Sequence, residues 1–409
     1  MRLNEMISVA EALERVKSSV KLLSIEQVGL DGALGRVLAE DVAARVGHPP
    51  VAVSSMDGYA LRAADLATIP ATLEVIGEAV AGRGFGAVTG AGQAVRIFTG
   101  APLPAGADAV VMQEDCERSG DRVTVGERVS EGRFIRPAGL DFHEGETLLS
   151  SGTVLSAREI GLAAAMNVPW LMVRRKPRIA YLATGNEVVM PGDPLRAEQI
   201  ISSNSLALGA YVRVLGGVPV NLGIAGDDAD SLVRLLAGAS QADMLVTIGG
   251  VSVGDYDLVR QVLDEKDMEL GFHRVAMRPG KPVMFGSLGG MPVLGLPGNP
   301  VSAGVTAVVF LKPAMEAMLG IGGGGEPAPS ALLGGDLTAN GQRQDYLRAN
   351  LGRDTGGNWV ATPFAAQDSA MMARFAAADC LIVRPPLAAA AKAGARVEIM
   401  PLRHGLLSF

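Results

Sequence analysis

Acidic side chains follow three successive aliphatic runs in the middle of the sequence. They are Glu187, Asp227, Asp228, Asp255 and Asp257. If the runs are parallel strands, their carboxyl ends share the sheet edge where ligands bind in open α/β folds. Helix N-capping or a favourable contact with a helix dipole explains any one of these acids equally well. The set as a whole favours a shared crevice.

The close approach of these carboxylates carries an electrostatic cost. Two carboxylates about 5 Å apart at an effective dielectric constant near 20 repel by roughly 3 kcal/mol. Several converging on one pocket would raise one another's pKa unless a cation joined them. A hard divalent ion with oxygen ligands, most simply Mg²⁺, meets this need and completes its shell with water and phosphate oxygens. The sequence therefore predicts a divalent-metal site among these acids.

The glycine-rich turn "GGVSVGDYDL" at 249–258 resembles a phosphate-binding turn, but it carries acids where a P-loop ends in lysine. The basic residues come later, as Arg274, Arg278 and Lys281 around Pro279-Gly280. The following "GLPGNPVSAG" predicts a helix that begins near Pro300 and points free N–H groups at an anion. A surface charge would explain a lone arginine, but it explains this combination less well. The acids would thus hold a metal, and the bases and the helix terminus would hold the anion.

Residues 177–321 predict an α/β domain. Buried strands alternate with helices, which implies parallel βαβ units with helices on both faces of a sheet. The predicted strands are 178–183, 218–224 and 244–248, and the predicted helices are 203–215, 228–239 and 257–265.

The segments on both sides of this domain contain short β-like runs broken by glycine and proline. Residues 46–145 read as a β-rich module inserted into a domain made of 1–45 and 146–176, in which Ser8 and Ser156 begin helices. A glycine- and proline-rich linker precedes a β domain at 327–409, a small barrel or sandwich. The predicted fold class is α/β plus β-rich modules. It has a central three-layer α/β/α domain with a mostly parallel sheet, an inserted β-rich domain and a C-terminal β-barrel-like domain.

Composition narrows the function classes. The 409 residues carry a net charge of −7 without a basic block, which disfavours nucleic-acid and membrane partners. Cys116 and Cys380 are the only cysteines, so no disulfide framework is expected. The N-terminus does not resemble a secretion signal, and the aliphatic stretch 301–311 is too short for a bilayer. We expect a cytoplasmic protein.

Six motifs resemble signatures of one family, the molybdopterin molybdenumtransferases, known as MoeA and as the E domain of gephyrin. They occur in the family's order and span nearly the whole chain. They are "SSMDGYA" (54–60), "TGAPLPAGADAVVMQE" (99–114), "TGNEV" (184–188), "GGVSVGDYD" (249–257), "RPGKP" (278–282) and "LPGNPVSA" (296–303).

The resemblance implies a reaction and an assembly. Such enzymes use Mg²⁺, molybdate and adenylylated molybdopterin, cleave the phosphoanhydride, and release AMP and molybdenum cofactor. The family fold has four domains, and an elongated homodimer formed through the 1–45 and 146–176 domain places the active site between subunits. Expected partners also include a molybdopterin adenylyltransferase and acceptor molybdoenzymes.

The resemblance also assigns residues. It implies that Glu187, Asp227 and Asp257 form the acidic cluster, which is catalytic and holds Mg²⁺. It also implies that Asp57 and Thr99 are catalytic positions that orient ligand or water. Asp57 could instead serve only its Asp-Gly turn. The substrate-binding positions are Arg136, Asp141, Asp228, Gly249, Gly250, Ser252, Arg274, Arg278, Lys281, Pro297, Gly298, Asn299, Pro300, Arg348 and Ser369.

The chain departs from the family pattern in places. Residues 51–55 lack an acid and an amide, Leu140 stands where an acid is common, and Arg274 and Arg278 replace lysines implicated in molybdate binding. Arginine keeps the charge but offers a planar fork in place of a point donor. Three rival functions remain open: the preceding adenylylation of molybdopterin, a scaffold without catalysis, and a pterin-binding paralogue with altered chemistry. Preference for molybdate over tungstate also stays open.

Overall fold

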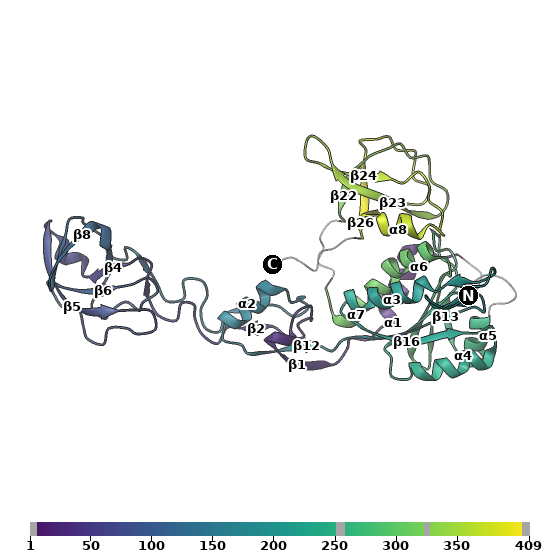
Figure 1. Ribbon diagram of the computed structural model, residues 1–409, viewed down its shortest axis with the longest axis horizontal. Coiled ribbons are helices and arrows are strands. Elements are labelled where there is room, and N and C mark those ends of the chain that lie inside the picture. Colours follow the sequence, from purple (N-terminus) through teal and green to yellow (C-terminus); the bar gives the residue numbers. More distant parts are fainter. Residues whose placement is uncertain (1–5, 251–257, 323–327, 403–409) are drawn as a thin grey trace.

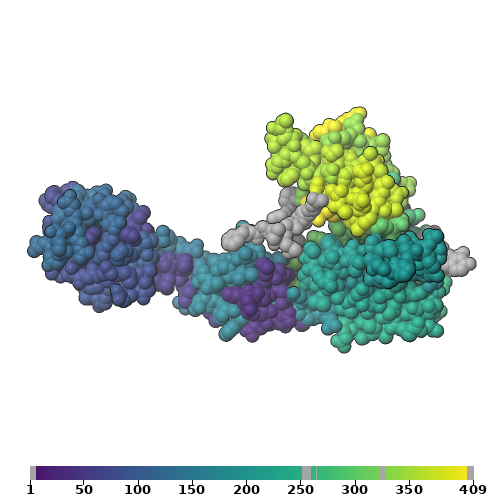
Figure 2. Space-filling model, in the orientation of Figure 1, coloured from purple at the N-terminus to yellow at the C-terminus, as the bar shows by residue number. Residues whose placement is uncertain are grey.

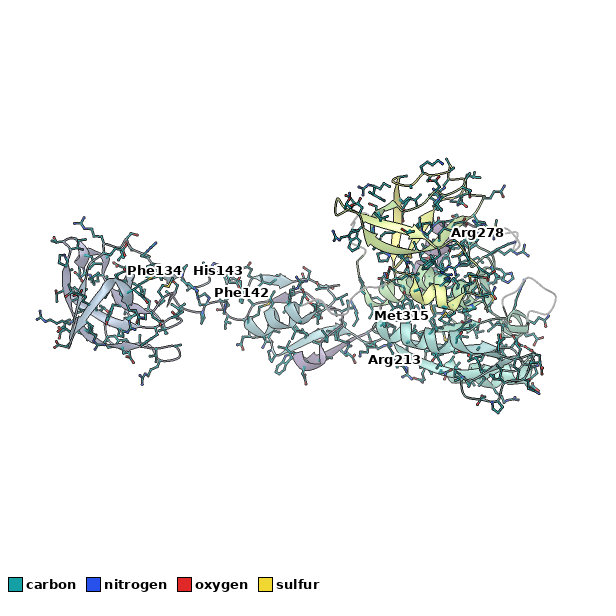
Figure 3. All side chains as sticks on the ribbon, turned by 45° about the horizontal axis from the view of Figure 1, so that its top comes forward. Phe134, Phe142, His143, Arg213, Arg278 and Met315 are labelled. Carbon is teal, nitrogen blue, oxygen red and sulfur yellow. The ribbon has the colours of Figure 1, made fainter. Side chains whose placement is uncertain are left out.

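The computed structural model describes residues 6–250, 258–322 and 328–402. The molecule is elongated, with the inserted module at one end and the central and C-terminal domains at the other (Figures 1 and 2). A small domain and two thin connecting segments join the ends. The connectors meet where His48 stacks on Phe142, with ring centroids 5.6 Å apart, and Phe142 and His143 lie in this connecting region in Figure 3.

The small domain is built from segments distant in sequence. Strand β1 (Ile25–Gly29) pairs antiparallel with β12 (Trp170–Arg174), and β2 (Val42–Ala43) pairs with β11 (Thr147–Leu149). Helix α2 (Ala157–Ala165) begins with the predicted capping box, in which Ser156 and Glu159 satisfy each other's backbone N–H groups. The 3₁₀ turn η1 covers Leu30–Gly32.

Helix α1 (Val9–Ser19) packs elsewhere than the β1 strand that follows it. Its buried residues Val9, Ala12 and Val16 belong to the apolar core of the central domain. The segment 1–45, assigned from sequence to one domain, therefore contributes to two. At its start, the Ser8 hydroxyl accepts from the Glu11 N–H at 3.1 Å, as a helix N-cap does.

The inserted module is a six-stranded sheet in the order β7-β4-β6-β5-β9-β8. Its alternating buried residues form two small clusters, one on each side. The short strands β3 and β10 pair where the module meets its connectors. The bounds are β3 Val53–Ser54, β4 Gly58–Leu61, η2 Ala63–Leu66, β5 Ala71–Ala79, β6 Gln93–Ile97, β7 Ala109–Met112, η3 Gln113–Asp115, β8 Cys116–Ser119, β9 Arg122–Val125 and β10 Ile135–Arg136.

The central domain is the predicted three-layer α/β/α unit. Its sheet order is β16-β13-β17-β21-β20-β18. The first four strands are mutually parallel, and β20 is antiparallel to both of its neighbours, β21 and β18. Separate apolar clusters cover the two faces. The bounds are β13 Arg178–Thr184, β14 Val188–Val189, β15 Ile200–Ile201, α3 Ser203–Val214, β16 Val218–Ala225, α4 Ala229–Leu236, η4 Ala237–Ala239, β17 Met244–Ile248, α5 Leu258–Glu265, β18 Glu269–Phe272, β20 Met284–Leu288 and β21 Met291–Leu296.

One helix is longer than the sequence indicated. It runs continuously from Pro300 to Leu319 as α6 (Pro300–Thr306), the π-helical η5 (Ala307–Leu311) and α7 (Lys312–Leu319). Its 20 residues reach the length and apolar composition of a membrane span. The expectation that this segment is too short for a bilayer, which considered only residues 301–311, was therefore wrong about its length. Two thirds of its apolar window is buried inside the structure (67%), as in the core helix of a folded domain.

The C-terminal domain is a closed barrel of β23, β24, β22, β26 and β25, sealed by the β23–β25 pairing. A two-residue strand of the central domain, β19 (Met277–Arg278), joins it by pairing parallel with β23. The two domains therefore share a sheet. The bounds are β22 Ser330–Leu333, β23 Gln344–Arg353, β24 Trp359–Pro363, α8 Met372–Ala377, β25 Cys380–Arg384 and β26 Arg396–Pro401.

Candidate active site

A crevice of about 690 Å³ opens at the carboxyl ends of β13, β17 and β21. This is where ligands bind in open α/β sheets. Its walls combine side chains of the central domain with Ala370 of the C-terminal domain. The predicted residues that line it are Glu187, Gly249, Gly250, Pro297, Gly298, Asn299 and Pro300.

Glycines expose the backbone along part of the crevice wall. Gly249 and Gly250 have φ angles of +85° and +64°, a region that side-chain-bearing residues rarely adopt. A Cβ on Gly298 would come within 3.8 Å of the Gly249 Cα, so the two turns face each other closely. The paired glycines bring polar backbone groups within reach of a ligand without a side chain between.

The first two acidic loops are joined by reciprocal hydrogen bonds. The Asn186 N–H donates to the Asp227 carboxylate at 3.1 Å, and the Asp227 N–H donates to the Asn186 Oδ1 at 3.2 Å. Glu187 is exposed and lines the crevice next to this link. Asp228 serves as the N-cap of α4 by accepting from the Ser231 N–H at 2.7 Å. The capping alternative therefore holds for Asp228, while Glu187 and Asp227 come from adjacent loops.

The donor set suits a hard cation. Glu187 and Asp227 offer carboxylate oxygens with the Asn186 amide oxygen nearby, and such oxygens are the ligands that Mg²⁺ takes. Ser252, Asp255 and Asp257 lie outside the described residues. Within 6–250, 258–322 and 328–402, no group of at least three His, Cys, Asp or Glu side chains is arranged to hold a metal.

The C-terminal domain caps the N-terminus of α6. The Val301 N–H donates to the Ser369 carbonyl at 3.0 Å, and the Asn299 Nδ2 donates to the Ser369 hydroxyl at 2.9 Å. The expectation that this helix start presents only free N–H groups to an anion was therefore wrong at Val301. Its donor is used between domains, a contact that the spacing of the motifs did not reveal.

The predicted basic residues differ from one another in their contacts and exposure. Arg278 makes a two-pronged ion pair with Asp345, whose side chain is 5% exposed, at the β19–β23 junction, and Figure 3 shows Arg278 where the two domains meet. The Nε of Arg274 is buried and has no hydrogen-bond partner among the described residues. Lys281 is exposed. Arg348 is 1% exposed and binds the loop that carries Ser369.

On the inserted module, Asp57 and Thr99 are in direct contact. One Asp57 carboxylate oxygen accepts from both the backbone N–H and the hydroxyl of Thr99, each at 2.8 Å. These two hydrogen bonds lower the pKa of Asp57 below its ordinary value. Arg136 and Asp141 line a neighbouring hollow of about 570 Å³, together with Gly100. The predicted residues of this module therefore form a second group.

The two groups lie at opposite ends of one chain. Asp57 directly precedes β4, which Figure 1 places at the far end of the molecule from β13 and its crevice. Within one chain, the structure brings together the residues of each group, but it does not bring the groups to one another.

Sequence reasoning missed several polar residues of the crevice. Asn204 donates to the Gly298 carbonyl at 2.7 Å and lines the cavity, as do Thr184, Ser202 and Ser203. The run Ser202-Ser203-Asn204-Ser205 at the start of α3 was the available signal, because polar residues at a helix start beside a sheet edge commonly face a ligand.

Comparison with known proteins identifies the family. Three family models match in order along the chain: the MoeA N-terminal region (domains I and II) at 7–167, a probable molybdopterin binding domain at 180–317, and the MoeA C-terminal region (domain IV) at 330–402. The fold is thus that of the MoeA-type transferases of molybdenum cofactor biosynthesis.

Individual relatives agree over most of their length. A molybdopterin molybdenumtransferase of Nostoc is 38% identical over 80% of this chain and 77% of its own, and that of Haemophilus influenzae is 34% identical over 93% and 94%. The crystal structure of a MoeA molybdopterin biosynthesis protein of Pyrococcus horikosii superposes with a TM-score of 0.84 at 32% identity, covering 98% of this chain and all of that one. The chain belongs to the molybdopterin molybdenumtransferase family.

Proposed function

We propose that this chain inserts molybdenum from molybdate into adenylylated molybdopterin in a Mg²⁺-dependent reaction that cleaves the phosphoanhydride and releases AMP and molybdenum cofactor. The observation that carries the proposal is the crevice at the carboxyl ends of β13, β17 and β21. There Glu187 lines the same crevice as the backbone of Gly249, Gly250 and Gly298, and the loop of Glu187 is hydrogen-bonded through Asn186 to that of Asp227.

In this proposal the acidic residues bind the metal, and the glycine backbone binds the phosphate. Glu187 and Asp227, with Asp257, would hold Mg²⁺, which supplies Lewis-acid stabilisation of the charge on the departing phosphate of AMP. Gly249, Gly250 and Gly298 let the pterin phosphate approach the backbone, and Asn204 fixes the Gly298 turn.

Molybdate is a dianion and needs cationic partners. Arg274 and Lys281 would supply charge-assisted hydrogen bonds. Arg278 is occupied by Asp345, and its 57% exposed side chain keeps donors turned to solvent, so it would contribute charge more than a full two-pronged grip.

We propose that the active enzyme is a homodimer in which the inserted module of one subunit completes the crevice of the other. Asp57 and Thr99 cannot serve the crevice of their own chain across the length of the molecule (Figure 1). The small domain offers an apolar surface for association, since Ile25, Trp170 and Met172 are 40%, 51% and 36% exposed on the β1–β12 pair. The proposed setting is the cytoplasm, with an adenylyltransferase supplying the substrate and molybdoenzymes accepting the product.

An assay of AMP release tests the function. The purified protein is incubated with adenylylated molybdopterin, with and without molybdate and Mg²⁺, and AMP is quantified. We expect release only when both are present, and the same assay with tungstate measures oxyanion preference. Formation of adenylylated pterin from ATP and molybdopterin would support the adenylylation alternative. Absence of any pterin chemistry would support a scaffold.

A further inference from the structure

Gln367 uses its whole side-chain amide in the loop between β24 and α8. Its Oε1 accepts from the backbone N–H of Arg348 at 3.0 Å and from the Arg348 Nε at 3.1 Å. Its Nε2 donates to the Arg348 carbonyl at 3.0 Å and to the Phe364 carbonyl at 2.9 Å. The amide therefore ties strand β23 to the first turn of the loop at both its donor and its acceptor end.

Arg348 continues this network along the loop. Its side chain is almost fully buried, and burial lowers its pKa. A buried guanidinium needs hydrogen-bond partners to offset the loss of water, and Arg348 finds them in the Gln367 Oε1 and the Asp368 carbonyl, the latter at 2.8 Å. The Asp368 carboxylate in turn accepts from the Ala370 N–H at 2.8 Å. These hydrogen bonds therefore tie the loop 364–370 to β23 and to itself.

The far end of the same loop leaves the barrel and meets the crevice. Ser369 caps α6 through its carbonyl and contacts Asn299 through its hydroxyl, while Ala370 forms part of the crevice wall. Gln367 itself is absent from that wall and makes its side-chain contacts within the C-terminal domain.

We propose that Gln367 is a positioning residue for the crevice: its amide sets the loop conformation that delivers Ser369 to Asn299 and Val301, and so fixes the Asn299–Pro300 wall against which substrate binds. The role requires an amide. A carboxylate at 367 could accept from Arg348, but it would present a second acceptor to the carbonyls of Arg348 and Phe364. The effect on catalysis rests on the function proposed above, whereas the effect on the α6 cap does not.

Hydrogen exchange of the Val301 amide, followed by mass spectrometry on peptides covering 297–303, tests the positioning directly. In Gln367→Ala and Gln367→Glu, we expect this amide to exchange about tenfold or more faster, because its acceptor is no longer held in place. The control is Gln344→Ala. Gln344 is also partly buried on β23, and it donates instead to the Tyr346 hydroxyl at 2.7 Å; exchange at Val301 should stay unchanged there.

Kinetics supply the second readout. Both Gln367 variants should raise KM for adenylylated molybdopterin about fivefold or more while kcat stays within about twofold, the pattern of weakened binding.

Unchanged exchange at Val301 in Gln367→Ala, with only a lower Tm, would show that Gln367 stabilises the barrel without positioning the crevice, and it would overturn the proposal. Wild-type exchange in Gln367→Glu would equally overturn it. If Gln367→Ala does not fold, the size-matched Glu variant gives the exchange result alone. If the unaltered protein does not release AMP, the proposed function is wrong, but the hydrogen-exchange test of Gln367 remains valid.

Discussion

At the scale of single residues, the local environment decides what each acid does. Asp57 is exposed, yet two donors of Thr99 hold it as a carboxylate, whereas Asp228 is committed to capping α4. Because the folded pKa of Asp57 lies below its unfolded value, ionisation of this group stabilises the fold above the unfolded pKa. That contribution is lost as pH falls through the folded pKa.

Thr99→Val tests this pairing. The substitution removes the hydroxyl donor and keeps the backbone N–H, so the pKa of Asp57 should rise part of the way to its ordinary value. Carboxyl ¹³C NMR titration measures the change, and Thr72→Val, on the same module, serves as the control. An unchanged Asp57 titration in Thr99→Val would show that the hydroxyl does not stabilise the carboxylate.

Short-range residue contacts were predictable and long-range ones were not. Ser156 and Glu159 are three positions apart, so their capping box follows from local sequence. Arg278 and Asp345 are 67 positions apart, and Asn299 and Ser369 are 70 apart. Such pairs depend on how the barrel docks on the central domain, which periodicity and local propensity do not specify.

At the scale of elements, the approach of α8 to α6 depends on a missing side chain. A Cβ on Gly304 would overlap the ring of Phe375. The glycine thus lets the barrel helix approach the helix whose first turn borders the crevice. The sequence pattern predicted β13, β16 and β17 to within a residue, because buried strands appear as apolar runs, but it did not predict β18, β20 or β21 of the same sheet. It did not predict this close approach, since nothing near Gly304 in the sequence identifies its partner.

Gly304→Ala should lower the free energy of unfolding by about 1–3 kcal/mol through overpacking. Chemical denaturation monitored by circular dichroism measures it. The control is Gly161→Ala in α2, where a Cβ meets nothing within 4 Å; there the change should be neutral or stabilising by up to about 1 kcal/mol. Equal stability of the Gly304 and Gly161 variants would contradict the close packing of Phe375.

At the scale of the whole molecule, the elongated shape separates the two groups of site residues. The family resemblance implies a site shared between subunits, and the proposed homodimer rests on the observation that the module bearing Asp57 lies at the far end from the crevice. Composition alone could not have predicted the separation of the two groups or a site shared between subunits, because it carries no information on how the domains are placed.

Mixing two inactive variants tests a site shared between subunits. If Asp57 of one subunit serves the Glu187 crevice of the other, each Asp57→Ala/Glu187→Ala heterodimer retains one intact site. Random reassociation of equal amounts should then restore about a quarter of the unaltered activity. A single chain carrying both substitutions, mixed with itself, is the control and should stay inactive. No recovery on mixing, with subunit exchange verified by mass spectrometry, would place each complete site within one chain.

The most direct test is the single-turnover rate of AMP release from adenylylated molybdopterin, with Mg²⁺ and molybdate, in Glu187→Ala and Asp227→Ala. Asp230→Ala is the matched control, because Asp230 is an exposed acid in the first turn of α4. The account predicts a loss of about a hundredfold or more in the first two variants, with unchanged Tm, and parental rates in the third. Parental release of AMP by Glu187→Ala and Asp227→Ala would contradict it.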